Sequence, residues 1–551
     1  MPLLLRNSEQ GKFLYALVVT ILFFGIVLAS LQTRYNTNDD VVMHLLADGH
    51  IFSNLPTEHL GLMHFFLGRT LKTLYQWQPF FPFYGVMLYS FYGLALTFYA
   101  YSLSRLGLGY SLVGGWLIVA GGWGLLTIQF TIVAFLLAGT GVFLWFSLSV
   151  HPASLSGMAR RRLRLAASGL IVLGSMVRFE SAMAAMLCGV PPVLFLFWVQ
   201  GRTFPEIVRL ILPVLLAGFA AVVLHGIDRN HYAHTAGWEH FAEGVDAIHK
   251  LIDNKQVSYT PQTADVFAQA GWTENDAAAF SHWIFSNNPQ FSEEKLTFIT
   301  NRIPAVQPRK TDEYIAVFIW ITIMFYPLCL RFNDVSPIGK KTTIVHLLWI
   351  GTVLLLITIF YRFPPWRLFY PFTVAYFTTY VGIVAFFYPK QLRQKELLFL
   401  FSLCALGTGY ALVASSQSIG HMQKAYSHDL AELLRMDSQA ILAPWGGVFP
   451  FEYLVHPLKS GSNFSDMKLL VTGNWATFTP TFQESAKERT GIKDSFKALC
   501  DDHTYSVISP EDIPILVRYL EEHYHYKAKA KLTFRGTDAR TDFYRIECTL
   551  P

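Results

Sequence analysis

The sequence predicts a polytopic α-helical membrane protein with a soluble α/β domain at its C-terminus. Of its 551 residues, 52% are hydrophobic and only 15% are charged, whereas soluble domains carry roughly 25% charged residues. About eleven apolar stretches approach the ~20 residues that a helix needs to cross a bilayer. Beyond residue 414 the composition becomes mixed, and short apolar runs alternate with turn residues.

The predicted spans follow one another along the first 414 residues. They cover residues 13–31, 80–103, 111–127, 131–150, 165–177, 181–199, 209–224, 314–330, 342–360, 368–388 and 396–414. The first span follows a basic start, and its apolar run is longer than the usual core of a signal peptide. We therefore expect it to be retained as a membrane helix.

Basic residues predict the orientation of the bundle. With the N-terminus inside, the basic positions 105, 160–164, 202, 331–341 and 390–395 all fall in cytoplasmic connections. This agrees with the enrichment of Lys and Arg in short cytoplasmic loops. The same orientation places the loops 32–79 and 226–313 of the bundle outside, together with the domain 415–551. Function is expected in these segments, because long loops usually bind, gate or catalyse.

The C-terminal segment has the alternating pattern of a small α/β module. Helices are expected at residues 421–436 and 510–524, and strands or apolar runs at 440–445, 469–472, 505–508, 531–534 and 543–548. Cys500 and Cys548 are the only cysteines outside the predicted spans. In an oxidising compartment we expect them to form a disulfide. The alternative is two unrelated thiols, since sequence does not show whether their Cα atoms come within about 7 Å.

Adjacent carboxylates directly after the first span give the strongest local indication of chemistry. Asp39 and Asp40 end the run that begins at Asn36. Neighbouring carboxylates repel each other, so they suit a shared cation or a general base that removes a proton from a hydroxyl. The alternative is a solvated cap that opens a helix at 41–49.

The same loop carries further histidines and carboxylates. Glu58 and His59 are candidate substrate contacts or ligands, as are His44, Asp48 and His64. Their spacing does not match a fixed metal-ligand pattern. No cofactor is therefore assigned with certainty, and a divalent metal stays open.

Two short outward turns between spans carry arginines. Arg178 and Glu180 lie in one turn, and Arg362 and Arg367 lie in the other. Outward arginines oppose the usual charge bias, and an anionic phosphate is a natural partner for a forked guanidinium. The alternatives are pairing with Glu180 and contact with lipid headgroups.

The order of these features resembles the GT-C superfamily of membrane glycosyltransferases. In both, one span precedes an acidic pair in the first outward loop of a multi-span bundle, and a soluble tail follows. Three stretches also resemble recurring stretches of bacterial membrane proteins with this organisation: residues 38–40, residues 271–276 with Trp283 and 291–292, and residues 176–180.

The resemblance implies an inverting transferase whose donor is a sugar on a polyprenyl phosphate. It gives Asp39 or Asp40 the role of base or metal contact. It also implies a multi-pass protein of the bacterial plasma membrane, with an envelope glycan or lipid as acceptor and membrane lipids as partners. The candidate substrate-binding residues are Glu58, His59, Arg178, Glu180, Arg362 and Arg367.

Two other functions remain alternatives: a transporter or flippase of lipid-linked saccharides, and a non-catalytic protein of envelope assembly. Transporters tend to place ionisable residues within their spans and to show two related halves, and neither feature is visible in this sequence. A nucleic-acid partner is not expected, because the net charge is only +5 and the basic residues form no stripe.

Overall fold

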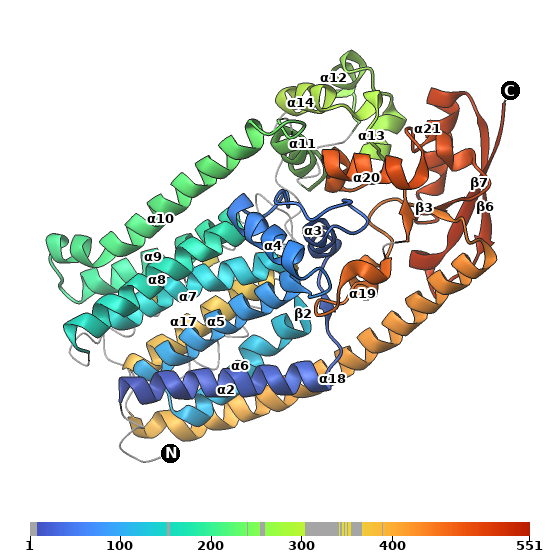
Figure 1. The fold of residues 1–551 in the computed structure, drawn as a ribbon. Helices are drawn as coiled ribbons and strands as arrows, with labels where there is room; N and C mark the ends of the chain where they lie inside the picture. Colours follow the sequence, from blue (N-terminus) through green and yellow to red (C-terminus); the bar gives the residue numbers. More distant parts are fainter. Residues whose placement is uncertain are drawn as a thin grey trace. The chain divides into compact units, whose positions relative to one another are not determined.

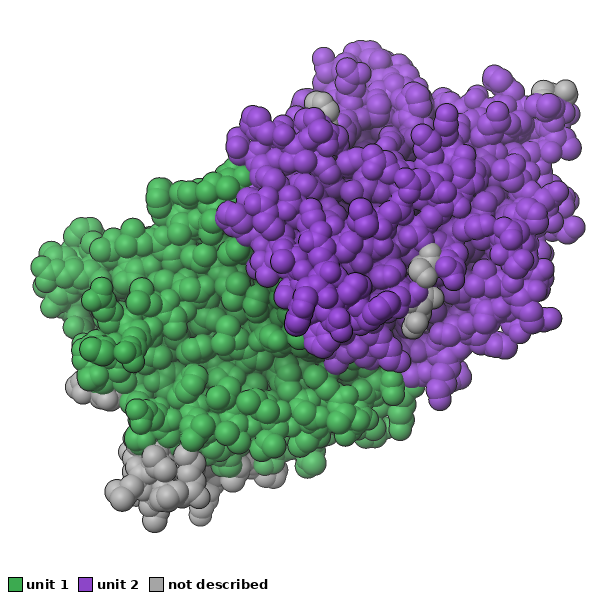
Figure 2. All heavy atoms as spheres, in the orientation of Figure 1, with its two compact units in different colours: residues 1–36, 85–227, 308–418 green, residues 37–84, 228–307, 419–551 purple. Residues whose placement is uncertain are grey.

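The computed structural model describes residues 8–150, 155–239, 241–253, 259–303, 366–387, 390–464 and 466–550, with short helical pieces between 341 and 353 (Figure 1). The chain forms two compact units, which Figure 2 colours green and purple. Unit 1 contains residues 1–36, 85–227 and 308–418, and unit 2 contains residues 37–84, 228–307 and 419–551. Two long helices, α10 (Phe204–Ala233) and α18 (Lys390–Met436), contribute residues to both units.

Unit 1 is a helical bundle of the kind that the composition predicts. Besides its parts of α10 and α18, its described helices are α2 (Glu9–Ser30), most of α5 (Phe83–Arg105), α6 (Tyr110–Leu126), α7 (Phe130–Val150), α8 (Gly157–Val177), α9 (Phe179–Val199) and α17 (Trp366–Phe387). Five helices of the described chain, α2, α5, α7, α9 and α10, are long and apolar enough to cross a membrane. The span 314–330 and most of 342–360 lie outside the described residues, so the number eleven stays a prediction.

Helix α7 forms the centre of unit 1. It is apolar around its whole circumference, and nearly all of its residues are buried, as expected for a helix that packs on every side. Small residues let α8 approach it closely. A Cβ atom at Gly141 would lie 2.5 Å from the carbonyl oxygen of Ala167, and one at Gly174 would lie 2.7 Å from that of Ala134. Close approach at small residues is typical of packing between membrane helices.

Buried polar contacts also join the helices of unit 1. The hydroxyl groups of Tyr92 and Tyr370 lie 3.0 Å apart, and the indole N–H of Trp116 donates to Thr378 Oγ1 over 3.0 Å. Unit 1 also holds the parallel pair β1 (Arg34–Tyr35) and β2 (Thr127–Ile128). Each of these hydrogen bonds satisfies a polar group that would otherwise be costly to bury.

Unit 2 is built on a five-stranded sheet of order β4-β3-β5-β7-β6. Its strands are β3 (Ile441–Pro444), β4 (Lys468–Leu469), β5 (Thr504–Val507), β6 (Lys527–Phe534) and β7 (Phe543–Thr549). Strands β4, β3 and β5 are parallel, whereas β7 is antiparallel to β5 and β6. The helices α19 (Phe451–Leu454), α20 (Pro480–Thr490) and α21 (Ile513–Tyr524) lie between strands along the chain. The prediction of a sheet-containing C-terminal region is confirmed.

Unit 2 also includes both long loops of the sequence. The first contributes α3 (Asn38–Asp48) and α4 (Phe65–Trp77). The second contributes α11 (Phe241–Ile248), α12 (Ala264–Gln269), α13 (Glu274–Ser281) and α14 (Glu293–Arg302). Helix α3 begins at Asn38, earlier than the predicted 41, because Thr37 already occupies the N-cap position.

A disulfide ties the end of the sheet to its neighbouring helical turn. Cys500 and Cys548 are bonded, with Cα atoms 5.4 Å apart and a sequence separation of 48 positions. Cys548 lies on β7, and Cys500 ends the short 3₁₀ helix Lys497–Cys500. The predicted disulfide is therefore confirmed.

Candidate functional site

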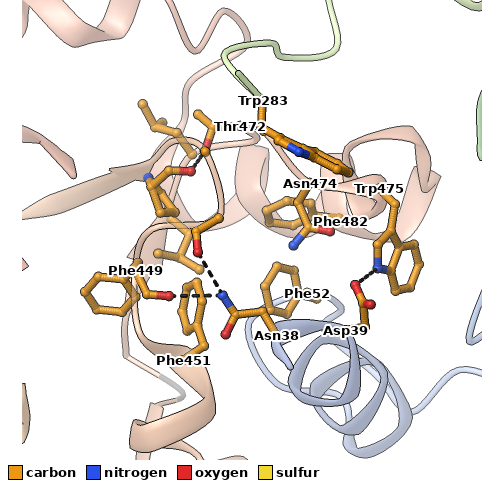
Figure 3. A pocket seen from close by; sticks show the side chains of 16 residues that line it. Asn38, Asp39, Phe52, Trp283, Phe449, Phe451, Thr472, Asn474, Trp475 and Phe482 are labelled. Carbon is orange, nitrogen blue, oxygen red and sulfur yellow. Dashed lines mark hydrogen bonds between the residues drawn. The ribbon is translucent and has the colours of Figure 1, made fainter. Parts of the chain in front are cut away.

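A cavity of about 260 Å³ lies in unit 2, beyond the carboxyl ends of β3 and β4 (Figure 3). In open α/β sheets, ligands bind preferentially at this edge. Aromatic side chains form much of its wall: Phe52, Trp283, Phe449, Phe451, Trp475 and Phe482. The polar lining comes from Asn38, Asp39, Thr472 and Asn474.

Glycines let the backbone around the cavity fold tightly. Gly446 and Gly447 follow β3 with φ values of +66° and +64°, a left-handed conformation that glycine adopts without strain. Gly473 follows β4, and a Cβ atom there would lie 1.9 Å from the carbonyl oxygen of Trp283. Only glycine fits this close approach, which places Trp283 against the loop after β4.

Asn38 holds the start of α3 against the loop that follows β3. Its amide nitrogen donates to the carbonyl oxygens of Gly447, at 3.3 Å, and Phe449, at 3.1 Å. Its amide oxygen accepts from the backbone N–H of Glu452 at 3.1 Å. All the polar atoms of this side chain are thus engaged, and the neighbouring Asp39 is fixed at the cavity.

Asp39 is half-buried and lines the cavity. The indole N–H of Trp475 donates to its Oδ1 over 3.0 Å, and the two side chains lie side by side in Figure 3. A hydrogen bond to a carboxylate fixes its orientation and is stronger than one between neutral groups. Asp39 therefore presents an oriented carboxylate to whatever fills the cavity.

Asp40 differs from its neighbour. It is fully buried and does not line the cavity. Thr37 Oγ1 donates to its Oδ2 over 3.1 Å, and the hydroxyl group of Tyr84 lies 3.4 Å from its Oδ1. Asp40 thus lies in the first turn of α3, where the backbone N–H groups favour a carboxylate. Its complete burial differs from the solvated cap of the alternative interpretation.

Glu58 and His59 are not among the cavity-lining residues. Glu58 Oε2 accepts from Arg69 Nε over 2.8 Å, and this bond lowers the pKa of Glu58. His59 Nε2 lies 3.2 Å from Nε2 of His231, which comes from α10. Burial lowers the pKa of His59 to about 4. The pair that the sequence places near the acidic residues belongs to a separate cluster.

The other polar residues of the first loop have structural partners. His44 is buried and its Nε2 lies 3.6 Å from Asp48 Oδ2, which also accepts from the backbone N–H of Gly461. His64 caps α4, because its Nδ1 accepts from the N–H of Phe66 over 3.2 Å. These contacts hold the loop together and do not involve the cavity.

The stretch 271–276 also proves to be a structural element. Thr273 and Asp276 form a reciprocal capping box at the start of α13, which satisfies N–H groups that the helix leaves open. Asp276 Oδ1 also pairs with His523 Nε2 over 2.7 Å. In the loop 226–313, the family resemblance rests on residues 271–276, Trp283 and residues 291–292. Of these, Trp283 lines the cavity.

The predicted phosphate-binding residues belong to unit 1. Arg178 joins α8 to α9, with Nε 3.7 Å from Glu180 Oε2 and its guanidinium 5.1 Å from the ring centre of Phe130. Pairing with Glu180, one of the alternatives for Arg178, is therefore observed. Arg367 lies in the first turn of α17 and is half-buried. Arg362 lies outside the described residues.

Sequence reasoning missed Asn474 and Trp475. Both lie in the loop after β4, immediately after Gly473. A glycine and an asparagine after a short strand predict a turn, and loops at the carboxyl edge of a sheet often carry function. That pattern indicates a functional loop. It does not predict that Trp475 donates a hydrogen bond to Asp39, which is distant in sequence.

Searches against protein-family models, curated proteins and solved structures found no match for this chain.

Proposed function

We propose that this protein is a membrane glycosyltransferase that takes a sugar from a polyprenyl-phosphate donor, with Asp39 as general base. The observation that carries the proposal is the position of Asp39, whose carboxylate is oriented by Trp475 on the wall of the aromatic cavity. The apolar helices support a membrane-embedded protein. The plasma-membrane location and the outward orientation of unit 2 are parts of the same proposal.

The lining of the cavity favours a saccharide as acceptor. Sugar rings present apolar C–H faces and a rim of hydroxyl groups. Aromatic side chains offer broad apolar faces, and a few placed polar groups fix orientation. Trp283, Trp475 and Asn474 combine these properties. The volume of about 260 Å³ lies near the lower end of the range for ligand pockets, roughly 300 Å³, and suits one sugar unit of an envelope glycan or glycolipid.

The reaction then follows from general acid–base chemistry. Asp39 takes the proton from a hydroxyl group of the acceptor while the oxygen of that hydroxyl group attacks the anomeric carbon of the donor. A bond forms between that oxygen and carbon, and the bond from the carbon to the phosphate oxygen breaks. The electron pair leaves with the polyprenyl phosphate. A single displacement of this kind inverts the anomeric carbon.

The leaving phosphate needs positive charge. Arginine suits this role because its planar fork binds phosphate oxygens through two hydrogen bonds, and stabilising charge on a leaving group lowers the barrier. Arg178 and Arg367, with Arg362, are the proposed donors of this charge. The pairing of Arg178 with Glu180 supplies a counter-ion for the unliganded guanidinium.

Purified full-length protein in lipid nanodiscs tests the proposal directly. It is incubated with a panel of polyprenyl-phosphate sugars, with and without oligosaccharide acceptors. We expect one donor to release polyprenyl phosphate and, with the right acceptor, to give a glycosylated product of opposite anomeric configuration. Loss of the signal in Asp39→Asn but not in the exposed Glu484→Gln control supports the assignment. Movement of a lipid-linked sugar across sealed vesicles without transfer would instead favour the flippase alternative.

A further inference from the structure

We propose that Glu58, His59 and His231 form a binding site for a divalent transition metal of the zinc class. The Nε2 atoms of the two histidines lie 3.2 Å apart, and Glu58 Oε1 lies 3.9 Å from Nε2 of His231. All three candidate ligand atoms lie within 4.8 Å of one another. This proposal goes beyond the glycosyltransferase function and can be tested without it.

The donor set matches the preference of zinc. Zinc binds imidazole nitrogen at about 2.0–2.1 Å in tetrahedral geometry, which puts two ligand nitrogens a little over 3 Å apart. Two neutral imidazoles and one carboxylate leave a fourth position for water. Imidazole also selects transition metals over magnesium and calcium, which prefer oxygen ligands.

The surrounding residues hold the ligands in place. His59 stacks on Trp238 with ring centres 4.9 Å apart, and His231 stacks on Phe65 at 4.0 Å. Arg69 Nε binds Glu58 Oε2 at 2.8 Å. Arg69 Nη2 also makes a longer contact of 3.4 Å with Oε1, the oxygen that faces His231. Because the shorter bond goes to Oε2, Arg69 acts as an outer partner that orients the ligand carboxylate.

The backbone at Glu58 is held just as closely. A Cβ atom at Gly68 of α4 would lie 2.0 Å from the carbonyl oxygen of Glu58, so only glycine permits this packing. The loop before α4, α4 itself and the end of α10 therefore meet at the site. A metal there would join segments that are 172 residues apart in sequence.

A metal at this place would also support the wall of the cavity. Gly61 follows His59 by two positions, and a Cβ atom at Gly61 would lie 2.5 Å from the ring of Trp475. Trp475 in turn donates to Asp39. The site thus lies two contacts away from the proposed base, and its loss should loosen the loop that packs on Trp475.

A second cluster, Asp276, Glu522 and His523, has a similar composition but different bonding. Asp276 accepts from Thr273, Gln290 and His523 at 2.6–2.8 Å. Glu522 accepts from Arg518 and Thr273. The carboxylate oxygens of both Asp276 and Glu522 thus accept hydrogen bonds from protein donors. This second cluster therefore serves as the matched control.

The test uses full-length protein in detergent, stripped with EDTA and then exposed to zinc chloride. After gel filtration, metal analysis should find one zinc per chain, and thermal unfolding should shift to higher temperature. His59→Gln and His231→Gln should lose both effects. Arg69→Ala should weaken zinc affinity by about tenfold to 100-fold, as expected for an outer partner. His523→Gln should leave the stoichiometry and the affinity unchanged.

Cobalt substitution gives an independent measurement. A tetrahedral site should produce visible absorption bands with wild-type protein and Arg69→Ala, but not with His231→Gln. Wild-type protein that retains no zinc and shows no cobalt spectrum would overturn the proposal, because the two histidines would then share only a hydrogen bond. Equal zinc retention by the histidine variants would overturn it as well.

Discussion

Trp475 donates its indole N–H to Asp39 Oδ1 over 3.0 Å, although the two lie 436 positions apart in sequence. The bond connects the first turn of α3 with the loop that follows β4. The two adjacent carboxylates have different surroundings, because Asp39 lines the cavity whereas Asp40 is fully buried and does not line it. This difference predicts different outcomes for the same substitution at neighbouring positions.

The first prediction concerns these two carboxylates. Asp39→Asn should abolish sugar transfer, since an amide cannot accept the hydroxyl proton. It should lower stability by about 1 kcal/mol at most, because the amide oxygen can still accept the N–H of Trp475. Asp40→Asn should retain measurable transfer but lower stability by about 1–2 kcal/mol, because it changes a buried carboxylate that accepts hydrogen bonds from Thr37 and Tyr84. Transfer assays and thermal unfolding of both variants check this. Full activity in Asp39→Asn would exclude it as the base.

The second prediction separates the hydrogen bond of Trp475 from its ring. Trp475→Phe keeps an aromatic wall but removes the N–H that orients Asp39. Hydrogen bonds to charged groups contribute about 1.5–3 kcal/mol, so we expect a fall in kcat of roughly tenfold or more. The KM for the acceptor should change little. Phe482→Leu, which alters the wall without touching this bond, is the comparison, and it should raise KM more than it lowers kcat.

The fold was predictable where local chemistry determines it. Short apolar runs between turn residues predict β3 and β5 to within about a residue, because strands of a buried sheet need such runs. The predicted span 396–414 and helix 421–436 are one continuous helix, α18. The intervening Ser415 and Ser416 suggest a break, but no proline separates the two stretches and the serines do not interrupt the helix.

The site was predictable only in part. The acidic pair can be found locally, since Asp39 and Asp40 follow an apolar span. Which of them faces a cavity depends on Asn38, whose three hydrogen bonds reach residues more than 400 positions away. Long-range contacts of this kind leave no periodic pattern in the sequence. The same holds for His231, which approaches His59 from another segment.

The third prediction concerns the arginines of unit 1. Arg178→Ala or Arg367→Ala should weaken binding of the polyprenyl-phosphate donor, and the matching Lys variant should restore it only partly, because lysine lacks the fork. Donor binding is measured with a fluorescent analogue in nanodiscs. Arg435→Ala, which removes an exposed arginine of unit 2, is the control. Unchanged donor affinity in both alanine variants would remove these residues from the site.

The fourth prediction is a loss of stability in acid. Burial lowers the pKa of His456 to about 4 and also lowers the pKa of His44. Both are therefore neutral in the folded protein at pH 7. Between about 6.5, the ordinary pKa of histidine, and 4, the unfolded chain binds more protons than the folded one. Stability is thus complete above pH 6.5 and falls as the pH drops toward 4.

His456→Gln tests the contribution of this histidine. Glutamine can still accept the N–H that Leu458 donates to His456 Nδ1, but it does not titrate. The difference in stability between pH 7.5 and pH 5 should shrink by on the order of 1 kcal/mol, since partial exposure of His456 screens the effect. Thermal unfolding at both pH values, with EDTA present, measures it. An identical acid response in wild type and variant would contradict the assignment.

The last prediction uses the disulfide between Cys500 and Cys548 to test both stability and orientation. The bond closes a loop of 48 residues, and the chain-entropy model assigns such a loop about 4 kcal/mol. Replacing both cysteines with serine should lower stability by up to that amount. In a variant whose other cysteines, Cys188, Cys329 and Cys404, are alanine, a membrane-impermeant thiol reagent should label intact cells only after reduction. Because disulfides persist in oxidising compartments, this result would place unit 2 outside the cytoplasm. Labelling before reduction would contradict the bond, and labelling only after the membrane is opened would reverse the orientation on which outward sugar transfer depends.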